Sequence, residues 1–294
     1  MSGRVVVVGA NGQLGSELVR AFAEDGRWTP MPLVHQEVEI VEPASVKAMF
    51  ACHQPSLVVN TAAYHVVEAA GNELEFFRVN ALGVKNLAEA ARAEDVPLVH
   101  FSTDYVFGDG GTRPYHEGDT PSPLNVYGTS KLAGEHILRA TDPRHYVVRV
   151  CGLYGRTGCR AKGGTNFVEM VLRQTDTGTS MRVVNDQIVS PTYAVDVARA
   201  LPGLVSRAPY GVYHMANPGA CSWYEFAVEI VELAGLRERV KLEPVSSGRY
   251  YSSVRRPAYS ALDNRALRAA GLPDLRPRTA AVAAYLEERK RANA

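Results

Sequence analysis

The stretch RVVVVGANGQLG, residues 4–15, decides the fold of this chain. Its β-branched run at Arg4–Val8 predicts a strand, and apolar residues at helical spacing within Gln13–Glu24 predict a helix. Glycines between the two let the backbone turn tightly and approach a pyrophosphate at the helix N-terminus. A tight turn without a ligand is the alternative, because the spacing is GxxGxxG. The predicted contacts to a dinucleotide are Gly9, Gly12, Gln13, Leu14 and Gly15.

Short apolar strands alternate with helical patterns through the first half of the chain. Leu57–Asn60, Leu98–Ser102 and Tyr146–Val150 indicate strands, and Glu73–Ala93 and Asn125–Ala140 indicate helices. Strands that are apolar on both faces are typical of a parallel sheet covered by helices on each side. The sequence therefore predicts an α/β fold with a doubly wound, Rossmann-like parallel sheet.

The character of the sequence changes near residue 150. We predict a dinucleotide-binding domain at 1–150 and a smaller C-terminal α+β substrate region at 151–294. Segments near 181–201 are expected to return to the first domain. The elements predicted in the second region include a helix opened by a capping box at Ser222–Glu225, a strand at Val240–Val245 and a last helix at Arg278–Arg291.

Composition and charge exclude several classes of function. The 294 residues are 46% hydrophobic with a formal net charge of +1, which favours neither nucleic acid nor an anionic membrane as partner. No apolar segment approaches the ~20 residues of a membrane span. Four cysteines without a CxxC pair indicate reduced thiols in a cytoplasmic protein. Eight histidines without an HExxH motif argue against a catalytic metal.

The second strand of such a fold carries the residue that reads the coenzyme's ribose. About 20 residues beyond the glycines one looks for an acid, which holds the hydroxyls of NAD, or an arginine, which binds the phosphate of NADP. Here that region is Val34–Ile40, which contains acids and no lysine or arginine. Glu37 or Glu39 could serve the ribose or be solvated. The choice between NADPH and NADH stays open.

Tyr127 and Lys131 have a YxxxK spacing within a predicted helix. Residues four apart lie on one face of a helix. A free phenol has a pKa near ~10, and a neighbouring ammonium favours its ionised form, so the pair suits proton transfer near neutral pH. An isolated YxxxK is more often a surface pair. Thr103, at the end of a predicted strand, adds a hydroxyl where ligands gather in parallel sheets. Together the three predict a catalytic site.

These residues carry a resemblance to a known family. Along nearly its whole length the chain resembles the extended short-chain dehydrogenases/reductases, and within them the dTDP-4-dehydrorhamnose reductases. The segments STDYVF (102–107) and PLNVYG (123–128) are the specific matches. The further matching stretches are Gly9–Gly15, Asn60–Tyr64, Val79–Ala81, Ser130–Glu135, Asn185–Gln187, Ser190–Thr192 and Arg256–Leu262.

The resemblance implies an NAD(P)H-dependent oxidoreductase that reduces the C4 ketone of a nucleotide-linked deoxysugar, dTDP-4-dehydrorhamnose, to dTDP-L-rhamnose. It implies that Tyr127 donates the proton, that Lys131 lowers the pKa of Tyr127 and holds the nicotinamide ribose, and that Thr103 positions the keto oxygen. Asp104 is implied as a substrate contact and Arg256 as a partner of the diphosphate. The residues implied along the cofactor are Gly12, Gln13, Glu39, Ile40, Ala62, Ala63, Tyr64, Tyr127 and Lys131.

One departure from the family's pattern and two rival functions remain. The family's rhamnose enzymes commonly carry a tryptophan that stacks on the sugar, and Gly152 occupies that position here. Related dehydratases have a glutamate where this chain has Tyr105, which argues against dehydration. A nucleotide-sugar epimerase of the same fold and a non-catalytic NADP-binding regulatory subunit stay open. A homodimer stays open as the assembly, and no nucleic-acid or membrane partner is expected.

Overall fold

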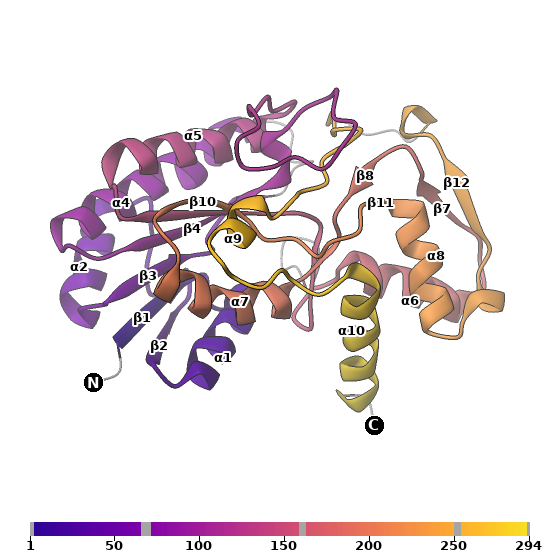
Figure 1. The fold of residues 1–294 in the computed structure, drawn as a ribbon, viewed down its shortest axis with the longest axis horizontal. Helices are drawn as coiled ribbons and strands as arrows, with labels where there is room; N and C mark the ends of the chain where they lie inside the picture. Colours follow the sequence, from indigo (N-terminus) through magenta and orange to yellow (C-terminus); the bar gives the residue numbers. More distant parts are fainter. Residues whose placement is uncertain (1–2, 66–71, 159–162, 250–253, 293–294) are drawn as a thin grey trace.

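The computed structural model describes residues 3–65, 72–158, 163–249 and 254–292. Its centre is a six-stranded parallel sheet with the strand order β10-β5-β4-β3-β1-β2 (Figure 1). This order confirms the predicted doubly wound sheet, because the chain builds outward from β1 in both directions. The strands are β1 (Gly3–Val8), β2 (Trp28–Leu33), β3 (Leu57–Asn60), β4 (Leu98–Thr103), β5 (His145–Val150) and β10 (Gly211–His214).

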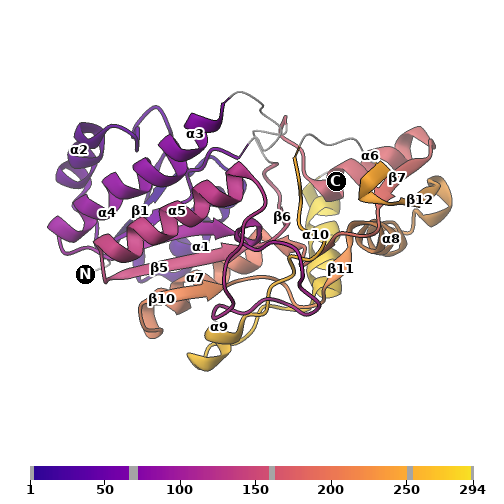
Figure 2. The same cartoon turned by 90° about the horizontal axis from the view of Figure 1, so that it is seen from above.

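Helices cover both faces of the sheet, as Figure 2 shows. Helices α1 and α7 pack together on one face, and α2, α4 and α5 form a layer on the other. Each face buries its own cluster of Val, Leu, Ala and aromatic side chains, which explains why the strands are apolar throughout. The helices are α1 (Gly15–Asp25), α2 (Pro43–His53), α3 (Glu73–Phe77), α4 (Val84–Ala93), α5 (Val126–Thr141) and α7 (Ala194–Arg207).

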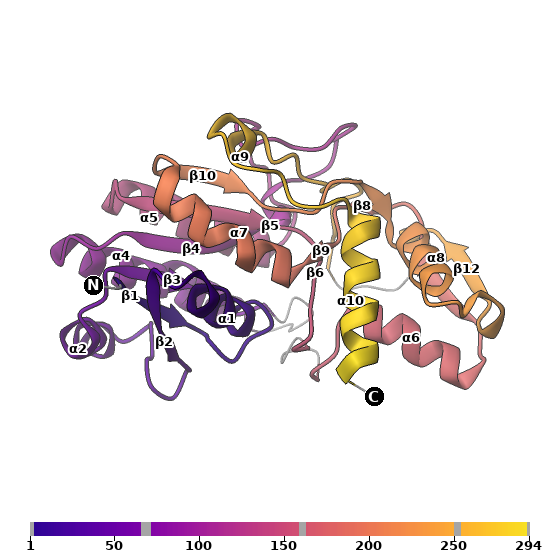
Figure 3. The same cartoon turned by 60° about the horizontal axis from the view of Figure 1, so that its bottom comes forward.

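The remaining elements gather at the carboxyl ends of the strands. A third apolar cluster joins α6, α8 and α10, with α10 standing between the sheet and the other two helices (Figure 3). Three pairs of short strands complete this part: β6 with β9, β7 with β12, and β8 with β11. The helices and short strands outside the large sheet and its covering helices are α6 (Phe167–Thr177), α8 (Trp223–Leu233), α9 (Arg265–Ala269), α10 (Arg278–Ala292), β6 (Leu153–Tyr154), β7 (Met181–Val184), β8 (Ile188–Val189), β9 (Thr192–Tyr193), β11 (Cys221–Ser222) and β12 (Leu242–Val245).

The segment near 181–201 divides between these two parts of the structure. Strand β7 pairs with β12, whereas α7 packs against α1 beside the large sheet. The strand that joins the sheet after residue 150 is β10. The division of the chain near residue 150 remains a proposal.

The expected position of the second strand was wrong. Strand β2 is Trp28–Leu33, and Val34–Ile40 forms turns after it. Pro30 and Pro32 in β2 hide its strand character in the sequence. They are tolerated because β2 lies at the sheet edge and pairs only with β1, so one row of its backbone N–H groups needs no partner strand.

The helix predicted at Glu73–Ala93 contains a π-helical turn, η1, at Arg78–Gly83. Asn80 lies in this turn and is fully buried. π-turns often occur at functional sites because the extra residue redirects side chains. Here the turn places the Asn80 amide between the backbone of Tyr64 and the hydroxyl of Ser130.

A buried ion pair connects β5 with α5 behind the carboxyl ends of the strands. The Arg149 guanidinium donates to both carboxylate oxygens of Glu135, at 2.9 and 2.6 Å, and both side chains are almost wholly buried. Ser102 also donates to Glu135, at 2.5 Å. This pair fixes α5 against the ends of β4 and β5.

We expect Arg149→Met to lower the free energy of unfolding by about 3–5 kcal/mol, because the Glu135 carboxylate would stay buried without its cation. Urea unfolding measures the loss. A double variant that also carries Glu135→Leu should regain most of the stability, since neither charge is then buried alone. If the single variant matched the wild type, the pair would not hold α5 in place.

Candidate active site

The glycine turn between β1 and α1 has two glycines that the backbone itself requires. Gly9 has a φ of +79°, and a Cβ there would lie 2.7 Å from Thr61 Oγ1. A Cβ on Gly15 would overlap the carbonyl oxygen of Gly9. At Gly12 a Cβ would meet only that same carbonyl oxygen, at 3.2 Å. Gly12 therefore faces space that a ligand can use.

We expect substitutions at Gly12 and at Gly15 to have different effects. Gly12→Ala should leave thermal unfolding within a few degrees of the wild type and weaken coenzyme binding about tenfold, because its methyl group crowds the ligand and not the turn. Gly15→Ala should lower stability by roughly 1–3 kcal/mol, because its methyl group collides with backbone. Fluorescence titration of NADPH and thermal unfolding separate the two effects. Unchanged NADPH affinity in Gly12→Ala would rule out the proposed contact.

The segment after β3 is tied to the glycine turn and to α5. The Thr61 hydroxyl donates to the carbonyl oxygen of Val8 at 2.7 Å. Asn80 accepts from the Tyr64 backbone N–H and donates back to its carbonyl oxygen, both at 2.9 Å. These hydrogen bonds hold the segment of Ala62, Ala63 and Tyr64 in place at the end of the sheet, next to β1.

Glu39 and Ile40 lie farther along, after β2. The Glu39 carboxylate contacts His35 Nε2 at 2.5 Å and accepts from the Val41 N–H at 3.1 Å. Ile40 is buried against Gly83, where a Cβ would come within 2.7 Å of its side chain. Only Glu39 keeps an exposed part of its side chain.

Tyr127 stands in the first turn of α5. Asn125 caps this helix by accepting from the Gly128 N–H at 2.9 Å. A Cβ on Gly128 would overlap the carbonyl oxygen of Tyr105, so glycine lets this turn approach the end of β4. The Tyr127 ring packs edge-on against Tyr105 and Phe76, with centroids 5.9 and 6.2 Å away. Two aromatic rings thus hold the phenol of Tyr127 in place.

Lys131 lies one turn further along α5 and is almost completely buried. Its Nζ donates to the carbonyl oxygen of Phe101 at 2.7 Å and contacts His100 Nε2 at 3.1 Å. Burial lowers the pKa of Lys131 to about 7, since it penalises the charged form. Both protonation states of Lys131 are therefore accessible near neutral pH.

Thr103 and Asp104 end β4 and begin the short 3-10 helix η2 (Asp104–Val106), on which α5 packs. Thr103 Oγ1 donates to Asp104 Oδ1 at 3.1 Å and accepts from the Tyr105 N–H at 3.2 Å. Asp104 Oδ2 accepts from Ser260 at 2.6 Å. Burial raises the pKa of the Asp104 carboxyl. The structure therefore turns Asp104 toward the protein interior.

Arg256 reaches the same place from the C-terminal part of the chain. Its guanidinium lies near the Tyr105 hydroxyl, whose pKa is raised by burial. Tyr105 also contacts the Tyr127 ring. Arg256 and Tyr127 thus lie against one shared side chain, although 129 residues separate them in the sequence.

Two residues that sequence reasoning missed lie at the site. The sequence assigns His100 no catalytic role, yet its ring contacts the Lys131 amine. Trp223 reads only as the first residue of a capped helix, yet its Cη2 atom lies 3.3 Å from where a Cβ on Gly152 would be. No local signal shows either contact, because each joins segments that are far apart in the chain.

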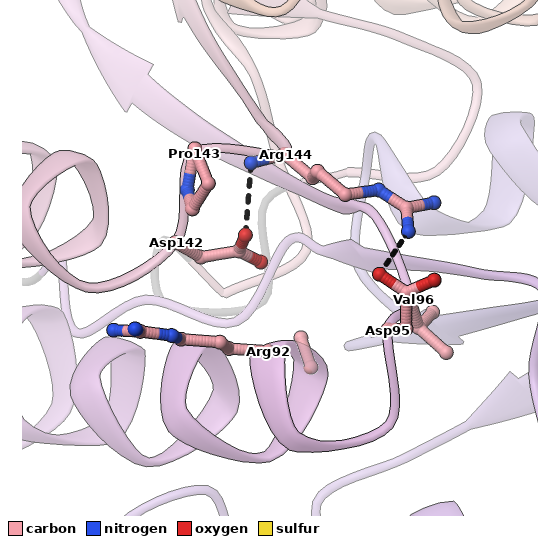
Figure 4. Close-up of a pocket in the computed structure, with 7 residues that line it drawn as sticks. Arg92, Asp95, Val96, Asp142, Pro143 and Arg144 are labelled. Carbon is pink, nitrogen blue, oxygen red and sulfur yellow. Dashed lines mark hydrogen bonds and ion pairs between the residues drawn. The ribbon is translucent and has the colours of Figure 1, made fainter.

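The end of the sheet opposite the glycine turn has a small pocket of its own (Figure 4). Asp142 Oδ1 accepts from the Arg144 backbone N–H at 2.8 Å, and the Arg144 guanidinium pairs with Asp95. None of the residues discussed above lines it, so we assign it no part in the site. It is lined by Ala91, Arg92, Asp95, Val96, Asp142, Pro143 and Arg144.

The described ranges contain neither a cluster of metal-binding side chains nor a helix that could span a membrane. No group of three or more His, Cys, Asp and Glu side chains there could hold a metal ion. No helix of that part of the chain combines the length and the apolar character needed to cross a bilayer.

Known proteins match the chain over almost its full length. Residues 3–291 match the family model of the RmlD substrate binding domain. The chain is 40% identical to spore coat polysaccharide biosynthesis protein SpsK of Bacillus subtilis, covering 98% of this chain and 99% of that protein. It is 38% identical to dTDP-4-dehydrorhamnose reductase of Mycobacterium tuberculosis, covering 97% and 93%. The structure of dTDP-4-dehydrorhamnose reductase from Bacillus anthracis in complex with NADP matches with a TM-score of 0.91 at 33% identity, covering 98% and 100%.

The fold and these relatives together define an NAD(P)H-dependent oxidoreductase of the short-chain dehydrogenase/reductase type. Within that class, the chain belongs to the RmlD substrate-binding domain family. The resemblance inferred from the sequence is thereby confirmed, and so is the nicotinamide coenzyme.

Proposed function

We propose that this protein reduces the C4 ketone of a nucleotide-linked 6-deoxysugar, with dTDP-4-dehydrorhamnose as the substrate and dTDP-L-rhamnose as the product. The observation that carries the proposal is the meeting of α5 with the end of β4. Tyr127 in the first turn of α5 lies against Tyr105, and Lys131 in the next turn contacts His100 and Phe101 of β4. A phenol, an amine and a hydroxyl at one end of a parallel sheet suit carbonyl reduction.

The residues of the glycine turn fit the coenzyme. Gly12 leaves space where a side chain would stand, and Gln13 Oε1 is buried without a hydrogen-bond partner among the described residues. The diphosphate would lie over this turn at the start of α1, where backbone N–H groups and the helix dipole favour an anion. Other residues proposed to hold the coenzyme are Gly9, Leu14, Gly15, Glu39, Ile40, Ala62, Ala63, Tyr64, Tyr127 and Lys131.

The bound reduced nicotinamide supplies the hydride. Tyr127 donates its phenolic proton to the C4 oxygen of the sugar as negative charge develops there. Lys131 exchanges a proton near neutral pH and, when charged, favours the phenolate of Tyr127. Thr103 would orient the same carbonyl oxygen by turning its hydroxyl hydrogen from Asp104 Oδ1 to the sugar.

The sugar nucleotide is recognised by groups from the second half of the chain. Arg256 provides a cation beside Tyr105, where it can face the diphosphate. Trp223 brings an indole ring to Gly152, so α8 supplies the aromatic surface that the sequence around Gly152 lacks. A planar ring at this place suits stacking on the apolar face of a deoxysugar.

Oxidation of the reduced nicotinamide, followed by its absorbance, tests the proposal. NADPH and NADH are each mixed with the protein and dTDP-4-dehydrorhamnose, and the UDP-linked 4-keto sugar serves as the comparison. We expect stoichiometric coenzyme oxidation with the dTDP sugar. Isomerisation without net oxidation would point to an epimerase, and coenzyme binding without any turnover would point to a regulatory subunit.

We also propose a cytoplasmic setting and a homodimer. Cys52, Cys151 and Cys221 are free thiols, as a reducing compartment such as the cytoplasm would keep them, and Cys159 lies outside the described residues.

Leu74, Phe77 and Leu82 are exposed along α3 and η1, which suits a homodimer. Light scattering of the purified protein measures its mass in solution and tests the dimer.

A further inference from the structure

Glu17 is a buried carboxylate in the first turn of α1, directly after the glycine turn. Its side chain is only 1% exposed. Arg156, in the segment that follows β6, donates to both carboxylate oxygens of Glu17, and the distance from its Nε to Oε1 is 3.0 Å. Arg20, one turn further along α1, donates to the same two oxygens at 3.2 and 3.3 Å. The buried charge of Glu17 is therefore balanced by two guanidiniums.

The segment that carries Arg156 lies against the start of α1. A Cβ on Gly155 would lie 3.3 Å from Gln13 Cγ in the glycine turn. On the other side of Arg156, Thr157 Oγ1 accepts from the Ser16 hydroxyl at 3.1 Å. The backbone on both sides of the guanidinium is thus in place beside the turn that is proposed to hold the coenzyme.

Arg156 also reaches α10. Its Nη1 lies 3.3 Å from Glu288 Oε2, and the Tyr193 hydroxyl donates to the same oxygen at 2.8 Å. These ion pairs join two carboxylates, Glu17 and Glu288, to two guanidiniums, Arg20 and Arg156. The hydrogen bonds to Glu17 raise the pKa of Arg156, which keeps its charge at every pH of interest. Loss of Arg156 would leave an excess negative charge at the first turn of α1.

An excess negative charge at this place opposes an anionic ligand. The backbone N–H groups and the dipole of the first turn of α1 favour an anion. Glu17 is the third residue of the helix, so its carboxylate acts on the same end of the dipole as a bound diphosphate would. Like charges repel each other strongly where burial keeps water and salt from screening them.

We propose that Arg156 is a positioning residue for the coenzyme: it neutralises Glu17, so that the first turn of α1 keeps its attraction for the coenzyme's diphosphate. The inference rests on the proposed placement of the diphosphate over the glycine turn and on no step of the proposed reaction. Since Arg156 also pairs with Glu288 of α10, one side chain links the coenzyme turn to the C-terminal part of the chain.

Three variants separate the charge of Arg156 from its contacts. Arg156→Met removes the cation and keeps an unbranched stem, Glu17→Gln removes the carboxylate charge and keeps its shape, and the third variant combines both. Fluorescence titration gives the affinity of each for NADPH. We expect Arg156→Met to bind NADPH about tenfold more weakly than the wild type. Glu17→Gln should bind at least as tightly as the wild type, and the double variant should return to within about threefold of it.

Arg20→Met is the matched control. Arg20 pairs with the same carboxylate, but its side chain is 51% exposed and stands one turn farther from the N-terminus of α1. Its loss should change the NADPH affinity less than about twofold, because water screens an exposed pair. The difference between Arg156→Met and the wild type should shrink as salt is added. Thermal unfolding of each variant reports its stability separately from its affinity.

Three results would overturn the proposal. They are unchanged NADPH affinity in Arg156→Met, weaker binding in Glu17→Gln, and a double variant that binds no better than Arg156→Met. The second would show that the contact and not the charge matters, and the third that Arg156 acts on the coenzyme without Glu17. If Arg156→Met does not fold, Arg156→Gln replaces it with the same expectation, since its amide can still donate to Glu17. The titration uses no sugar, so a failure of the proposed reaction is seen in a separate experiment.

Discussion

Tyr127→Phe is expected to lower kcat by about 10³-fold, because it removes the proton donor and leaves the ring. The contacts of the ring with Tyr105 and Phe76 do not use the hydroxyl, so the first turn of α5 should keep its place. The affinity for NADPH should change less than about threefold, since the glycine turn is untouched. Stopped-flow measurement of NADPH oxidation gives kcat, and fluorescence titration gives the affinity.

Tyr105→Phe is the matched control for this prediction. It removes the other hydroxyl of the aromatic pair, the one near the Arg256 guanidinium. We expect it to raise KM for the sugar nucleotide more than it lowers kcat, since Arg256 is the residue proposed to bind the diphosphate. Wild-type kcat in Tyr127→Phe would refute the role of Tyr127 as proton donor.

Lys131→Met is expected to abolish most turnover and, at neutral pH, to make the protein more stable. Burial lowers the pKa of Lys131 from 10.5 to about 7, so the folded state binds this proton more weakly than the unfolded chain. The folded state thus loses stability as the pH falls from about 10.5 to about 7, and below about 7 the full cost persists. Removing the amine should recover on the order of 5 kcal/mol there.

Urea unfolding at pH 6 and at pH 10 measures this difference. The stability gained by Lys131→Met should be large at pH 6 and nearly absent at pH 10, where lysine in the unfolded chain also begins to lose its proton. Lys85→Met serves as the control, because Lys85 is an exposed residue paired with Glu89. Equal gains at the two pH values would show that Lys131 is not kept neutral by burial.

The sheet was largely predictable because each central strand is apolar on both faces. Leu57–Asn60, Leu98–Thr103 and His145–Val150 lie inside the sheet, and their sequences show it. The two edge strands were not found. Strand β2 contains prolines that only an edge tolerates, and β10 has four residues with partly exposed positions. Edge strands carry a weaker apolar pattern because less of their surface is buried.

The candidate site was predictable where its residues are close in sequence. Tyr127 and Lys131 show their relation through helical spacing, and Thr103 through its place at the end of a strand. His100 and Trp223 gave no such signal. Their partners Lys131 and Gly152 are 31 and 71 residues away, and only the folded chain brings them together.

The most direct test of the account is the fate of the hydride. NADPH that carries deuterium at the transferred position of its nicotinamide is incubated with the protein and dTDP-4-dehydrorhamnose, and the product is examined by nuclear magnetic resonance. The account expects one deuterium at C4 of dTDP-L-rhamnose for each NADPH oxidised. A sugar product without deuterium, or NADPH that stays reduced while the sugar changes, would contradict it.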